Sequence, residues 1–130
     1  MGTWDIGSFD SDQAMDWAAD LTESDDLSLI EEALGVDERT LDECSGVDVL
    51  AAAEVVAALK GKPSAGLPED VVAWVAGHRG LNVTPLLPKA RQLVQGVLAE
   101  SCGLRQLWEE NQDECAKWKA TVVDLIARLK

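Results

Sequence analysis

The chain has 130 residues and carries 24 Asp and Glu against 11 Lys and Arg, a formal net charge of −13. Hydrophobic residues make up 47% of it, which excludes the composition of a disordered chain, and the length predicts one domain, residues 1–130. The acidic balance lacks the clustered bases that nucleic-acid phosphates and anionic lipid surfaces require. We therefore expect neither a nucleic-acid partner nor a membrane partner.

The excess negative charge lies entirely in the first half of the chain. Residues 1–65 hold 16 acids and three bases, whereas residues 66–130 hold eight of each. Two arrangements explain this asymmetry. Either the first half forms one acidic face, or the bases of the second half lie against it.

The three cysteines, Cys44, Cys102 and Cys115, are odd in number and widely spaced, so no disulfide framework is predicted. Free thiols favour a cytoplasmic protein. The N-terminal residues also lack the basic segment and apolar run of a secretory signal peptide, which favours the same location. No segment approaches 18 consecutive apolar residues, and we expect no membrane-spanning helix.

The first half of the chain is predicted to form an arm followed by helices. Residues 1–9 show no periodic pattern and are expected to form an extended N-terminal arm. Apolar residues at helical spacing, among them Trp17 and Leu21, predict a first helix over about 11–22. A second helix is expected over about 25–34. One short helical turn within 37–44 follows, and Ser45-Gly46 is expected to end it.

Residues 47–60 are apolar on nearly every side, which is typical of a central, buried helix. Lys60 and Gly61 are expected to end it, and residues 61–67 read as a hinge loop. A fourth helix is expected to begin at Pro68 and to end at Gly80, with Trp74 on its apolar stripe.

The rest of the chain also follows helical periodicity. A fifth helix is expected to begin at Thr84-Pro85, or at Pro88, and to run to about Glu100. A short helix at about 104–110 and a last helix at about 113–129 follow. Because no segment alternates with period two, the sequence predicts an all-α, compact single-domain bundle of six or seven helices around the Ala- and Val-rich helix at about 47–60. Four tryptophans lie on apolar helix faces and are expected to pack in the core: Trp17, Trp74, Trp108 and Trp118.

Three blocks of this sequence resemble a bacterial family of small single-domain proteins catalogued as a domain of unknown function. They are the opening MGTWDIGSFDSDQAMDWAADL, the middle AAAEVVAALKGKPSAGLPEDVVAWVAGHRG, and the ending LRQLWEE with Trp118. The resemblance covers nearly the whole chain. It implies a small bacterial protein of one domain, and it supplies no activity and no site residue.

Carboxylates on the first two predicted helices form the first candidate site. A face rich in carboxylates favours association with a basic protein partner. Hard cations also take carboxylate oxygens, although the EF-hand pattern is absent. The alternative is that these acids stabilise helix starts and otherwise form a solvated surface. The candidate binding residues are Asp12, Asp16, Asp20, Glu31 and Glu32, and the candidate metal ligands are Asp10, Asp12 and Asp16.

Glu54 is the second candidate, because it interrupts the apolar run of the most buried helix predicted. A buried carboxylate is costly unless it is paired or hydrogen-bonded. We expect a structural anchor that binds Arg79, His78, an indole N–H or backbone amides of the N-terminal arm. The alternatives are a general acid or base with a raised pKa, and a side chain that reaches solvent.

His78, the only histidine, follows Trp74 by four residues near a helix end. A core or boundary histidine is the simplest interpretation. A zinc site with the three cysteines would need a Cys-x₂-Cys pair, which is missing. The second functional hypothesis is a small-ligand or divalent-cation site, or an enzyme site, that uses Glu54, Trp74, His78 and Arg79.

The sequence contains no nucleophile elbow, no Walker motif and no dinucleotide-binding motif. The leading hypothesis is therefore that the chain is a small acidic cytoplasmic interaction protein without catalysis or cofactor. An example is an inhibitor or immunity-type protein that blocks a basic enzyme. A third interpretation is that the acids serve solubility alone.

Overall fold

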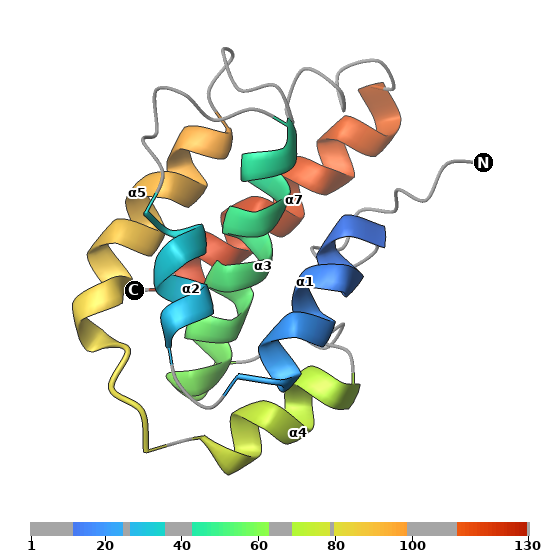
Figure 1. The fold of residues 1–130 in the computed structure, drawn as a ribbon. Coiled ribbons are helices and arrows are strands. Elements are labelled where there is room, and N and C mark those ends of the chain that lie inside the picture. The colour runs from blue at the N-terminus through green and yellow to red at the C-terminus, as the bar shows by residue number, and fades with distance from the viewer. Residues whose placement is uncertain are drawn as a thin grey trace.

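The computed structural model describes most of the chain, and its ribbon is drawn in Figure 1. The described residues are 12–24, 27–35, 43–62, 69–78, 80–98 and 112–129. Within them the chain forms six α-helices, one 3-10 turn and no strand, which confirms the all-α prediction. The elements are α1 (Asp12–Thr22), α2 (Ser28–Ala33), α3 (Glu43–Leu59), α4 (Glu69–Gly77), η2 (Thr84–Leu86), α5 (Leu87–Val97) and α7 (Gln112–Arg128). The predicted arm 1–9, most of the loop 61–67, the helix at 104–110 and Trp108 lie outside the described residues.

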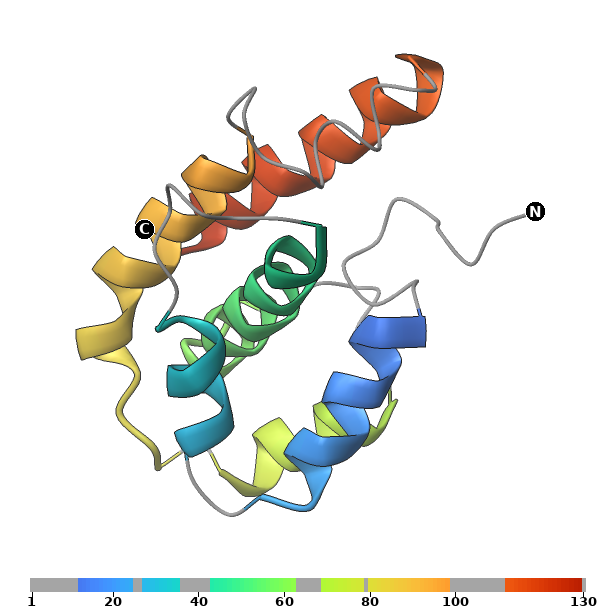
Figure 2. The same cartoon turned by 45° about the horizontal axis from the view of Figure 1, so that its top comes forward.

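Helix α3 is the centre of the bundle, as its composition predicts. It packs against α5, α1, α2, α7 and α4, and every residue from Val49 to Ala58 is buried. Figure 2 shows α5 and α7 on one side of α3, with α1 and α4 on the other. Its many alanines lack bulky side chains, so neighbouring helices can approach closely. A helix that is apolar all round is stable only when other elements cover every face of it.

The surrounding helices each turn one apolar stripe toward α3, at the spacing read from the sequence. Together with α3 they build one core cluster. Its buried members outside α3 include Trp17 and Leu21 of α1, Ile30 of α2, Trp74 and Val75 of α4, Leu93 and Val94 of α5, and Trp118, Val122 and Leu125 of α7.

The end of α3 forms at Gly61, as predicted. Gly61 has a φ of 98°, a left-handed conformation that L residues with a side chain rarely adopt. Its N–H donates to the carbonyl of Ala58 at 3.0 Å, and the N–H of Lys62 donates to the carbonyl of Ala57 at 2.9 Å. These are the two hydrogen bonds of a Schellman motif, and they satisfy carbonyls that a helix end otherwise leaves unpaired.

Several predicted boundaries are wrong. Helix α3 begins at Glu43 and runs through Ser45-Gly46 without a break. A glycine inside a helix costs about 1 kcal/mol, but Gly46 is buried here, and tertiary packing outweighs that propensity. Helix α2 begins later than predicted, at Ser28.

The fifth predicted helix consists of two elements. The turn η2 comes first, and α5 then holds Pro88 at its second position and ends at Val97, short of Glu100. Proline is tolerated there because the first four N–H groups of a helix have no carbonyl partner within it.

None of the helices in the described ranges combines the length and the apolar character that a membrane crossing demands.

Candidate functional site

Glu54 lies near the middle of α3 with 2% of its surface exposed. Its partner is Arg128, in the last turn of α7. Nη1 of Arg128 donates to Oε2 of Glu54 at 2.8 Å, and Nη2 donates to Oε1 at 3.0 Å. This two-bond, charge-assisted geometry is the strongest form of an ion pair between side chains.

Two further N–H groups of Arg128 also face acceptors. Nε donates to Oδ2 of Asp124, one helical turn earlier, at 2.9 Å, and Nη1 lies 3.4 Å from the carbonyl of Lys62. The hydrogen bond with Glu54 raises the pKa of Arg128, burial opposes that rise, and the two nearby carboxylates add to it. Arg128 is therefore positively charged at every physiological pH.

This pairing differs from the partners expected for Glu54. The partners expected from the sequence were Arg79, His78, an indole N–H and the backbone amides of the arm, and Arg128 was not among them. Arg79 lies outside the described residues, and His78 makes a different contact. The carboxylate of Glu54 is sealed from solvent.

Trp74 and His78 form a second polar cluster at the end of α4. Their rings stack with centroids 4.2 Å apart and planes 15° apart. Nδ1 of His78 lies 2.7 Å from the carbonyl oxygen of Trp74. Because a carbonyl oxygen only accepts, Nδ1 is the donor. The indole Nε1 of Trp74 donates to the carbonyl oxygen of Ser24 at 2.7 Å, which ties α4 to the residues that follow α1.

The exposed carboxylates of α1 and α2 form a surface of one sign. We call Asp16, Asp20, Glu23, Glu31 and Glu32 the acidic surface; all five side chains are exposed. In the described part of the chain, no ion pair involves any of them. Glu23 was not among the predicted residues, because it follows the helical stripe that drew attention to Asp16 and Asp20. Asp10 and the side chain of Asp12 lie outside the described residues.

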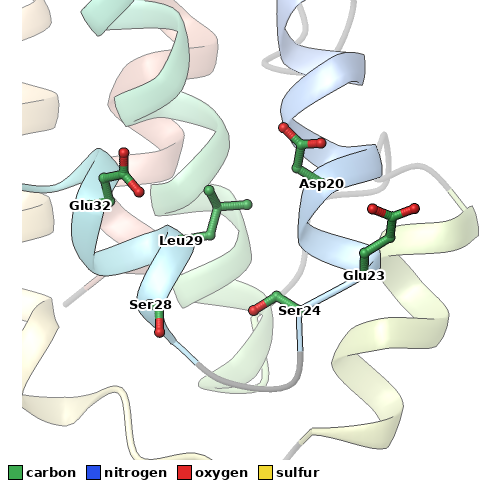
Figure 3. Close-up of a pocket in the computed structure, with 6 residues that line it drawn as sticks. All are labelled: Asp20, Glu23, Ser24, Ser28, Leu29 and Glu32. Carbon is green, nitrogen blue, oxygen red and sulfur yellow. The ribbon is translucent and has the colours of Figure 1, made fainter.

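An open, shallow pocket of about 330 Å³ lies between the end of α1 and α2. Figure 3 shows Asp20 and Glu23 on the α1 side, with Leu29 and Glu32 across from them on α2. The pocket is lined by Asp20, Glu23, Ser24, Ser28, Leu29 and Glu32. Three of these six side chains are carboxylates of the acidic surface, and Leu29 supplies the apolar contact.

A metal ion and an organic cation require different arrangements of carboxylates. Over the ranges that the structure describes, no group of three or more His, Cys, Asp or Glu side chains is close enough to hold a metal ion. An ammonium or guanidinium group makes weaker geometric demands, since it donates several hydrogen bonds over a wider span. The carboxylates that line the pocket are acceptors of the kind that such a group can use.

Comparison with known proteins places the chain in a family. The model of the family described as Domain of unknown function (DUF4259) matches residues 2–121, and the chain belongs to that family. No curated protein and no solved structure matches the chain. The family description names no activity.

Proposed function

We propose that this member of the DUF4259 family is a cytoplasmic interaction protein without catalysis, whose acidic surface binds a basic segment of another protein. The observation that carries the proposal is a set of five exposed carboxylates, three of which line one pocket, with no ion pair to any described base. An inhibitor or immunity-type protein that covers a basic enzyme surface is the concrete form of this function.

The charges on α1 and α2 have no counter-charge close in sequence. The first Lys or Arg of the chain is Arg39, which follows both helices. Asp16 and Asp20 are four residues apart on α1, and like charges at that spacing cost a helix about 0.2–0.5 kcal/mol per pair. A cationic partner relieves this repulsion. It also associates faster, because the summed field of the acids steers it toward the surface.

The pocket suits a single Lys or Arg side chain of that partner. Such side chains lay their aliphatic stem along apolar surface and keep the charged head among acceptors. Here Leu29 provides the apolar surface, and Asp20, Glu23 and Glu32 provide the acceptors. A volume of about 330 Å³ is at the small end of ligand pockets, which span about 300–1,000 Å³.

The alternative hypothesis, a ligand or enzyme site that uses Glu54 and His78, has weaker support. Glu54 is sealed and bonded through both oxygens to Arg128, and Nδ1 of His78 is bonded to Trp74. Neither residue lines the pocket between α1 and α2. An acid or base that acts on a substrate must come within hydrogen-bond reach of it.

A titration with a short lysine-rich peptide, followed by amide NMR shifts, tests the proposed function. We expect saturable shifts concentrated between Asp20 and Glu32, and an affinity that falls steeply as NaCl is added. The control is a peptide of the same length in which glutamines replace the lysines. It is expected to cause no shifts. Shifts spread evenly over all helices, or an affinity that salt leaves unchanged, would contradict the proposal.

A further inference from the structure

We draw no further inference here: the strongest candidate, the stacked Trp74 and His78 side chains at the end of α4, carries nothing, because its two hydrogen bonds join backbone carbonyls of the chain itself and nothing in the described residues points to a ligand or to a second state of the pair.

Discussion

Arg128 and Glu54 are 74 positions apart in the sequence, and their ion pair joins the end of α7 to the middle of α3. A lone carboxylate in an apolar helix is visible in the sequence, and its need for a partner follows from the cost of burying a charge. The identity of that partner does not follow. The sequence holds 11 Lys and Arg residues, and only the packing of α7 on α3 selects one of them.

Truncation of Arg128 tests how much this ion pair stabilises the fold. Arg128→Ala leaves the buried Glu54 charge unpaired, so we expect a loss of about 2–4 kcal/mol in the free energy of unfolding, measured by urea titration. Asp124→Ala is the control, because Asp124 is 68% exposed and a surface pair contributes about 0–1 kcal/mol. The double variant Glu54→Leu/Arg128→Leu should recover most of the loss, since it buries no charge. Equal losses for Arg128→Ala and Asp124→Ala would refute this account.

The raised pKa of Arg128 determines how its contribution changes with pH. A group whose pKa is raised by folding contributes stability below its unfolded-state pKa, and loses it only as pH rises through the folded-state pKa. The pKa of Arg128 is raised above a value that is already very high. Arg128 therefore keeps its charge between about pH 7 and about pH 10, and we expect the difference in unfolding free energy between the wild type and Arg128→Ala not to shrink over that range. Urea titrations at three pH values check this, and a difference that shrinks toward pH 10 contradicts it.

At the scale of the element, helical periodicity predicted the buried stripes well and the helix boundaries less well. Trp17 and Leu21 on α1, and Leu93 and Val94 on α5, are buried as their spacing predicts. The break at Ser45-Gly46 was wrong, because local propensity disfavours a helix there while burial inside the bundle favours one. Boundaries depend on contacts between distant segments, and a single sequence does not display them.

Two glycines near helix ends should respond to alanine in opposite directions. Gly61 has a φ of 98° and no atom within 4 Å of an added Cβ, so Gly61→Ala costs backbone strain alone, about 1–2 kcal/mol. Gly77 is the last residue of α4, with equally open surroundings and an ordinary φ. Gly77→Ala should therefore gain up to about 0.5–1 kcal/mol from helix propensity. Thermal unfolding of both variants checks the pair, and a loss at Gly77 as large as that at Gly61 would contradict the assignment of the Schellman end.

At the scale of the whole molecule, part of the excess negative charge of the first half of the chain lies on the acidic surface. Three carboxylates of the acidic surface, Asp20, Glu23 and Glu32, line one pocket, and the described ion pairs lie elsewhere, at Arg128. Asp16, Asp20, Glu31 and Glu32 are candidates that the sequence also offers, whereas Glu23 is not. The sequence did not predict the pocket, because the packing angle between α1 and α2 depends on the core beneath them.

Self-repulsion of the acidic surface should make stability depend on salt. Raising NaCl from about 10 mM to about 1 M shortens the Debye length from about 30 Å to about 3 Å, which screens the exposed carboxylates. We expect the melting temperature to rise with NaCl, and MgCl₂ at equal ionic strength to give the same rise. A further, saturable increase with Mg²⁺ that a chelator reverses would indicate specific metal binding and contradict an account based on screening.

Two variants that each remove one negative charge by the same chemical change test whether a basic partner binds between α1 and α2. Asp20→Asn alters the acidic surface, whereas Asp124→Asn alters α7, which packs against α3 and α5. The measurement is the affinity of each variant for the lysine-rich peptide at low salt, by calorimetry. We expect Asp20→Asn to weaken binding by about tenfold, equivalent to about 1.4 kcal/mol, and Asp124→Asn to weaken it by less than about twofold. Equal losses in the two variants would mean that only net charge matters, and would contradict a binding site between α1 and α2.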